Sequence, residues 1–257
     1  MHRCNGIRRV VPLLIGLVLS LSACAGKQHE QHERIIVVDP GHGGVDPGAL
    51  GSTTNVREKD VALRTGLALR DQLEATGRYR VIMTRGDDRT VRLCDRLQIA
   101  RQSQGELLIS LHADSLTTAP EVSGASVYTR SELASHDAPA RLAGKEECAE
   151  SLAAIDLSNK DIAPETLIDL AQRDAESITV AELLALELNR ATKMAKRRPA
   201  RADFVVLQSP DMPAVLIELG YLSNPADEQA LADDAHIARL AAAVARAVDL
   251  YFGVGAS

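Results

Sequence analysis

Short apolar runs alternate with amphipathic segments of helical length along most of this chain. The runs are rich in aliphatic and β-branched residues and end at Gly, Asp or Pro, which is typical of buried strands. They predict strands at 35–38, 79–84, 107–111, 124–128, 204–207 and 214–217. Apolar residues at helical spacing predict helices at 58–76, 91–103 and 235–251, with Leu93, Leu97 and Ala100 on the apolar face of the second. This alternation indicates one α/β domain with a mixed, mostly parallel sheet flanked by helices.

One long segment, at about residues 131–202, interrupts the alternation. Helical patterns occur within it at 152–157, 166–171 and 180–194, and the last leads into a cluster of lysines and arginines. Connections of this length are uncommon in compact domains and are usually functional or mobile. We therefore expect a long helical insertion between two strands of the domain.

The first 23 residues have the pattern of an export signal. Three arginines precede an apolar stretch at 10–21, which is too short to span a bilayer comfortably. The following Leu21-Ser22-Ala23-Cys24 resembles the lipobox of bacterial lipoproteins, which implies cleavage before Cys24 and its acylation. An ordinary secretory signal is the alternative. We expect a signal peptide at 1–23, a polar tether at 24–34 and the folded domain at 35–257.

The amino-acid composition indicates one folded core and argues against some classes of ligand. The 257 residues are 46% hydrophobic, which is enough for one well-formed core. A formal charge of -6 argues against nucleic acid. With four Tyr, two Phe and no Trp, the chain lacks the aromatic residues for a stacking platform, either for sugars or for single-stranded nucleic acid.

The chain has four cysteines. Cys4 is lost with the signal peptide and Cys24 is the expected site of acylation. Cys94 and Cys148 could pair in an oxidising compartment. Because Cys94 lies in an apolar, helix-like stretch, we expect it to be a buried free thiol.

Four polar residues occupy positions where a site is expected. His42 follows the first strand in a Gly-rich loop, Glu58 begins a helix, and His112 and Glu218 each follow an apolar strand. Ligands collect at the carboxyl ends of strands in open α/β sheets. Two imidazoles and one carboxylate are a ligand set for catalytic zinc, and a second carboxylate beside it is a candidate general base.

Each of these residues also has an ordinary structural interpretation. His42 can be a polar loop residue, Glu58 a first-turn acid that complements the helix dipole, and His112 a core imidazole bonded to Asp114. Glu218 ends a wholly apolar strand, where a lone charge is costly. It is therefore either functional or paired in a salt bridge with an arginine.

Several segments together resemble the zinc-dependent N-acetylmuramoyl-L-alanine amidases of the cell-division type (the amidase 3 family). The matching segments, in chain order, are IIVVDPGHGGVDPGALG, REKDVALRTGLAL, VIMTRGDD, VRLCDRLQIA, LLISLHADS, GASVYT and FVVLQSPDMPAVLIELGYLSNPADEQAL. The resemblance implies that His42, Glu58 and His112 bind Zn2+ and that Glu218 is the catalytic acid–base. It implies hydrolysis of the amide between N-acetylmuramic acid and L-alanine in peptidoglycan, with a role in daughter-cell separation.

The resemblance also implies regulation. In such relatives a helix within the insertion covers the zinc with a glutamate until a coiled-coil activator displaces it. Here Glu146 is the best match to that glutamate, and the helix at 180–194 is the candidate activator contact. A solvent-exposed charged face is the alternative for Glu146. We expect a monomeric, periplasmic, lipid-anchored protein, held at the outer rather than the inner membrane, that binds no nucleic acid. The alternatives are another zinc amidohydrolase or peptidase of wall fragments, and a non-catalytic peptidoglycan-binding lipoprotein.

Overall fold

The computed structural model describes residues 33–131 and 164–254. The predicted signal peptide, Cys24, most of the tether, the helical stretch at 152–157, Glu146 and Cys148 lie outside these residues. Those predictions therefore stay predictions.

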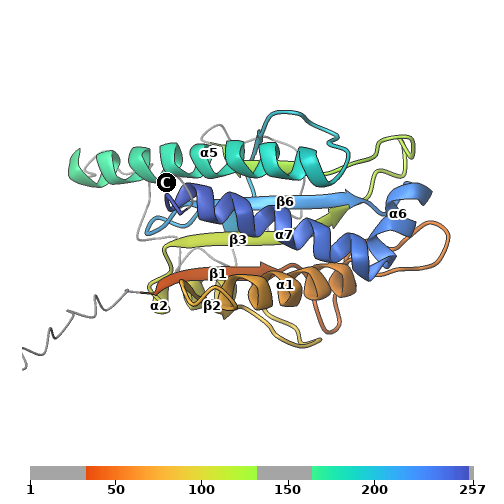
Figure 1. The fold of residues 1–257 in the computed structure, drawn as a ribbon, viewed down its shortest axis with the longest axis horizontal. Coiled ribbons are helices and arrows are strands. Elements are labelled where there is room, and N and C mark those ends of the chain that lie inside the picture. The colour runs from red at the N-terminus through yellow and green to blue at the C-terminus, as the bar shows by residue number, and fades with distance from the viewer. Residues whose placement is uncertain (1–32, 132–163, 255–257) are drawn as a thin grey trace, which may run out of the picture. The chain divides into compact units, whose positions relative to one another are not determined.

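Six strands form one sheet in the order β2-β1-β3-β6-β4-β5. Strands β2, β1, β3 and β6 run parallel to one another, whereas β4 and β5 run antiparallel to β6. The carboxyl ends of β1, β3 and β6 therefore lie at the same edge of the sheet (Figure 1). The strands are β1 (Arg34–Pro40), β2 (Tyr79–Met83), β3 (Leu107–Asp114), β4 (Ser126–Arg130), β5 (Ala200–Ala202) and β6 (Ala214–Tyr221).

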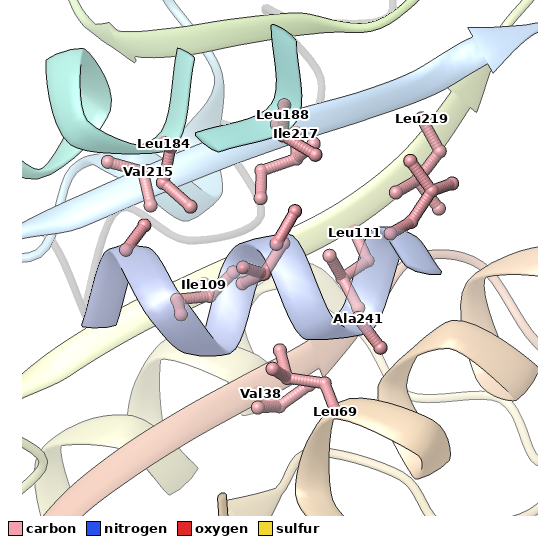
Figure 2. Close-up of a cluster of buried hydrophobic side chains, with 14 of the residues drawn as sticks. Val38, Leu69, Ile109, Leu111, Leu184, Leu188, Val215, Ile217, Leu219 and Ala241 are labelled. Carbon is pink, nitrogen blue, oxygen red and sulfur yellow. The ribbon is translucent and has the colours of Figure 1, made fainter. Parts of the chain in front are cut away.

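Helices cover both faces of the sheet, and each face has its own apolar cluster. On one face α1, α5 and α7 pack against β1, β3 and β6, with Leu69, Leu184 and Ala241 among the buried contacts (Figure 2). On the other face α2 and a short 3-10 turn, η2, pack around Leu97 and Leu216. These elements are α1 (Glu58–Glu74), α2 (Leu93–Gln102), α5 (Pro164–Ala191), η2 (Val205–Leu207), α6 (Pro225–Ala232) and α7 (Asp234–Tyr251). The predicted single α/β domain with a mixed, mostly parallel sheet is confirmed.

The structure divides the segment expected to be an insertion. Within it, α5 buries Val180, Leu184 and Leu188 completely in the main core, and β5 joins the sheet beside β4. Residues 164–202 are therefore integral to the domain. Of the helix predicted at 180–194, only the outward face is available to a partner.

Three local predictions were wrong. Residues 204–207 form no strand, because Leu207 and Gln208 donate backbone hydrogen bonds to Phe204 and Val205 and close a 3-10 turn. The β-branched residues Val205 and Val206 favoured a strand. Their side chains are buried, but the backbone that carries them forms a turn. Leu93 is 39% exposed because it is the first residue of α2, and Cys94 takes its place in the core.

The third wrong prediction concerns Cys94, which is disulfide-bonded rather than a free thiol. It is the only cysteine within the described residues. Apolar surroundings predicted a buried sulfur correctly, because Cys94 is 8% exposed, but burial does not distinguish a thiol from a disulfide. No helix in the described ranges is long and apolar enough to cross a membrane.

Candidate metal centre

Two strands, one loop and one helix bring the four candidate residues to the carboxyl edge of the sheet. His112 lies within β3, directly opposite Glu218 on β6 in the parallel register. His42 lies in the loop after β1, and Glu58 is the first residue of α1. Both strands continue past the predicted ends, β3 to Asp114 and β6 to Tyr221, so His112 and Glu218 are held by strand backbone rather than by loops. Strand positions fix side chains more firmly than loop positions do.

His42, Glu58 and His112 form one cluster whose candidate ligand atoms all lie within 4.8 Å of one another. Glu58 Oε1 is 3.0 Å from His42 Nε2 and 2.8 Å from His112 Nδ1. The imidazole rings meet edge to face, with centroids 5.0 Å apart. Two imidazole nitrogens and one carboxylate oxygen fit the ligand set of a catalytic zinc site, which keeps a further position for water or substrate.

The charges of the cluster support one another. Although burial opposes ionisation of Glu58, hydrogen bonds from His112 and His42 hold the pKa of this carboxyl far below its usual range. Burial likewise opposes protonation of His42, but hydrogen bonds and charge from Glu58 and Asp46 raise the pKa of this imidazole. The cluster is therefore a preformed arrangement of an anionic carboxylate between two imidazoles, which suits a divalent cation.

Asp46 is a site residue that the sequence analysis missed. Its Oδ2 lies 2.7 Å from His42 Nδ1, so it orients the ring and leaves Nε2 facing Glu58. Carboxylates that hold the outer nitrogen of a ligating histidine commonly tune metal sites. The signal was present in the sequence, since an aspartate four residues after a histidine in a Gly-rich loop can fold back onto it.

Glycines allow the close approach on which this cluster depends. A Cβ added to Gly41 would lie 2.3 Å from the His112 ring, so any side chain there would displace the imidazole. A Cβ added to Gly48 would lie 2.5 Å from Glu58 Oε2, and Gly48 also has a positive φ of 65°. His42 itself adopts a φ of 59°, an uncommon value for a residue with a side chain.

Two buried arginines hold the loop that carries His42. Arg96 donates to the carbonyl oxygens of Pro40 and His42, both at 2.7 Å. Arg85, which is fully buried, donates to the carbonyl oxygens of Pro40 at 2.9 Å and Gly41 at 2.7 Å. These bonds fix three consecutive carbonyl groups and so support the uncommon backbone at His42. Both arginines lie within the motifs that carry the family resemblance, but no role was predicted for either.

Arg96 is itself held by a buried carboxylate. Its Nη1 lies 2.7 Å from Asp39 Oδ1, and Thr84 and Ser110 donate to the two oxygens of the same carboxylate. Burial alone would favour a neutral Asp39, but the charge of Arg96 and these hydrogen bonds keep the pKa of Asp39 below its usual range. Through Arg96, this buried network stabilises the backbone at Pro40 and His42.

Glu218 has a different environment from the cluster opposite it. The residue is 7% exposed, and its Oε2 has no hydrogen-bond partner among the described residues. Burial, reinforced by the negative charges of Asp114 and Glu58, raises the pKa of Glu218 well above its usual range. No arginine within the described residues pairs with it, so the structure gives no support to the salt-bridge alternative. A buried carboxyl with a free oxygen beside a cation site is suited to proton transfer.

Comparison with known proteins identifies the family of this chain. The profile of the Amidase_3 family, described as N-acetylmuramoyl-L-alanine amidase, matches residues 36–249. The chain belongs to this amidase family. The match runs from β1 into α7, so all four candidate residues lie within the amidase domain.

Relatives of this amidase agree with the family assignment. The chain is 35% identical over 224 residues to N-acetylmuramoyl-L-alanine amidase AmiA of Escherichia coli K12. This alignment covers 86% of the chain and 76% of the relative. The chain is 33% identical over 229 residues to AmiC of Neisseria meningitidis serogroup B, covering 88% of this chain and 54% of that protein. The chain therefore spans about three quarters of the first relative and just over half of the second. The relatives and the family support N-acetylmuramoyl-L-alanine amidase activity, with peptidoglycan as the implied substrate.

A solved structure shows the same fold. The N-acetylmuramoyl-L-alanine amidase of Clostridium difficile 630 superposes with a TM-score of 0.67 at 23% identity, covering 87% of this chain and 98% of that one. At this identity the likeness concerns the fold alone.

Proposed function

We propose that this chain is a zinc-dependent amidase that cleaves the bond between N-acetylmuramic acid and L-alanine, with His42, Glu58 and His112 as the zinc ligands and Glu218 as the acid–base. The observation that carries the proposal is the pairing across the sheet edge. A compact His-Glu-His cluster faces a buried carboxyl that has no hydrogen-bond partner for one oxygen among the described residues.

In this proposal the roles of the residues follow from their surroundings. A bound zinc ion would supply polarisation of the substrate carbonyl and a lowered pKa for water. Asp46 holds His42 in one ring orientation, while strand β3 holds His112. Glu218 accepts the proton of the attacking water at Oε2 and returns it to the leaving nitrogen. Its buried position keeps bulk water from competing for that proton.

We also propose that the enzyme is exported and lipid-anchored through Cys24 in the periplasm, at the outer membrane, and that it acts in daughter-cell separation. The lipobox-like sequence before Cys24 supports the anchor. Two signals or several acyl groups are needed for stable membrane attachment, so a triacylated cysteine would suffice where one chain would not.

Regulation by the segment around Glu146 and by a coiled-coil activator is part of the same proposal. The outward face of α5 supports it, since Glu182, Leu186 and Asn189 are all exposed there. One structural neighbour is described as the CwlD amidase of Clostridioides difficile in complex with the GerS lipoprotein. That neighbour is an amidase bound to another protein, so partner binding is compatible with this fold.

The alternatives differ in what they hydrolyse and bind. A non-catalytic wall-binding protein would retain binding to sacculi without releasing fragments. Another zinc amidohydrolase would cleave small wall fragments at a different amide. Zinc content, dye release from labelled sacculi and mass analysis of the released fragments separate the three. The proposal requires zinc-dependent release of intact stem peptides that begin with L-alanine. Zinc-independent release, or cleavage within the peptide, would contradict it.

A further inference from the structure

The wall of the site beyond Glu218 is built by β4 and by the chain that follows α5. Ser126 on β4 pairs with Glu218 on β6, so the amino-terminal end of this antiparallel strand lies at the metal edge. Ala125, the preceding residue, accepts a backbone hydrogen bond from Ala195 at 2.8 Å and forms a bridge with Met194. Lys196 therefore follows a segment that lies beside β4, the strand that pairs with β6 at Glu218.

Lys196 is held at this place by a fixed aromatic ring. Its Nζ lies 2.8 Å from the hydroxyl oxygen of Tyr128 and 4.5 Å from the centre of that ring. Tyr128 is 8% exposed and meets Phe204 edge to face at 5.6 Å. An ammonium group over a rigid ring is restrained without being neutralised, and the Tyr128 hydroxyl uses only one of its three donors.

The ammonium group of Lys196 is open to a ligand. The residue is exposed, and it makes no ion pair with a carboxylate among the described residues. The nearby groups of the site are acidic: Glu58, Asp114 and Glu218. Lys196 is close enough for its charge to act on Glu218, where it opposes the larger effects of burial and of the two acids. A cation beside these acidic groups is complementary to an anionic group on the substrate.

We propose that Lys196 is a specificity-determining residue that binds a carboxylate on the peptide portion of the substrate. This inference rests on the proposed amidase function, because the peptide is the part released by the reaction. An ion pair there places the scissile amide between the metal cluster and Glu218 without any contact to the reacting atoms. The rigid ring of Tyr128 lowers the entropy cost of holding the ammonium in position.

The test compares two soluble substrates with the purified, zinc-loaded protein. One is an N-acetylmuramoyl-L-alanyl tripeptide with free carboxylates, and the other is the same compound with every carboxylate amidated. Lys196→Gln keeps a donor for Tyr128 but removes the charge, and Lys196→Arg restores the charge. Lys193→Gln is the matched control, because this exposed lysine contacts Ser123 and lies outside the site.

We expect Lys196→Gln to raise KM for the free-carboxylate substrate about 10- to 100-fold, with kcat changed much less. Its kinetics on the amidated substrate should match wild type, and Lys196→Arg should recover most of the loss. Zinc content and melting temperature of each variant are measured alongside, so that a misfolded variant is recognised. If Lys196→Gln is misfolded, the test uses the ratio of KM values for the two substrates in wild type and in Lys196→Arg. Equal KM values for both substrates in wild type would overturn the inference.

An equal loss on both substrates would assign Lys196 a structural role through Tyr128 and overturn the inference. Unchanged kinetics on both would also overturn it. Failure of the proposed function has a different signature, since wild type would then hydrolyse neither substrate and the inference would fall with it.

Discussion

His112 on β3 and Glu218 on β6 are direct partners in the parallel register of the sheet. The sheet backbone therefore fixes the distance between a candidate metal ligand and the candidate acid–base, whatever the surrounding loops do. Side chains of paired residues point to the same face, so both face one reaction space. The proposed mechanism depends on this relationship.

The Asp46 carboxylate is predicted to tune metal affinity by orienting the His42 ring. Asp46→Ala removes the partner of His42 Nδ1 and leaves the ring free to turn. Zinc affinity should fall about 10- to 100-fold, as is usual for such outer partners. Competition with a chromophoric chelator measures it. Asp71→Ala, which removes only an exposed ion pair with Arg70, is the control and should bind zinc as wild type does.

Arg96 is predicted to be essential for stability as well as for the shape of the His42 loop. Arg96→Met leaves the buried Asp39 carboxylate without its charged partner and frees the carbonyl groups of Pro40 and His42. Losing one partner of a buried ion pair costs about 3–5 kcal/mol of unfolding free energy. Urea unfolding of the zinc-free protein measures this cost. Arg70→Met breaks an exposed pair with Asp71 and should cost less than about 1 kcal/mol. Similar costs for the two variants would contradict the role of Arg96.

The Glu228 carboxylate is predicted to make stability depend on pH in the acid range. It accepts hydrogen bonds from the backbone and hydroxyl groups of Thr53 and Thr54, in the loop that leads to Glu58. Burial opposes its ionisation, but these bonds lower the pKa of Glu228 from 4.5 to about 2. The stabilisation is therefore complete above pH 4.5 and is lost as the pH falls toward 2.

Glu228→Gln should be less stable than wild type at neutral pH, because its amide cannot accept all of these bonds. The difference in melting temperature should shrink as the pH falls below 4.5. Thermal unfolding of the zinc-free proteins across this range measures it. A difference that stays constant with pH would show that the charge of Glu228 is not the cause.

Glu146→Ala tests the proposed autoinhibition. If this glutamate occupies the open zinc position at rest, its removal should raise basal hydrolysis of sacculi without an activator. Dye release by the purified protein is the measurement, with Glu147→Ala as the neighbouring control. Equal basal rates in wild type and Glu146→Ala would remove this residue from the role.

Most strands and helices were predictable because each apolar run has one period and stops at Gly, Asp or Pro. The cluster of His42, Glu58 and His112 was predictable from the same pattern, since carboxyl ends of parallel strands share an edge. Family resemblance was still needed to choose among the open interpretations of these residues. The structure brings the three together as the resemblance implied, and it leaves their role in zinc binding as a proposal.

Other features could not be read from the sequence. Helix α6 is short. Its capping residue Asn224 and its first residue Pro225 were not recognised as the start of a helix after the preceding strand. The positions of Arg85 and Arg96 depend on tertiary contacts with backbone carbonyl groups, which have no pattern along the chain. The place of Lys196 beside Glu218 depends on an antiparallel strand within an otherwise parallel region.

The most direct test of the central claim is a paired measurement of zinc content and sacculus hydrolysis on Glu218→Gln and His112→Ala. The account predicts that Glu218→Gln binds one zinc ion like wild type but loses hydrolysis by at least about 100-fold, since proton transfer contributes on this scale. His112→Ala should lose both zinc and hydrolysis while keeping its fold. His236→Ala, at a buried histidine on α7 outside the site, should keep zinc and hydrolysis. Hydrolysis that survives in Glu218→Gln, or zinc binding that survives in His112→Ala, would contradict the account.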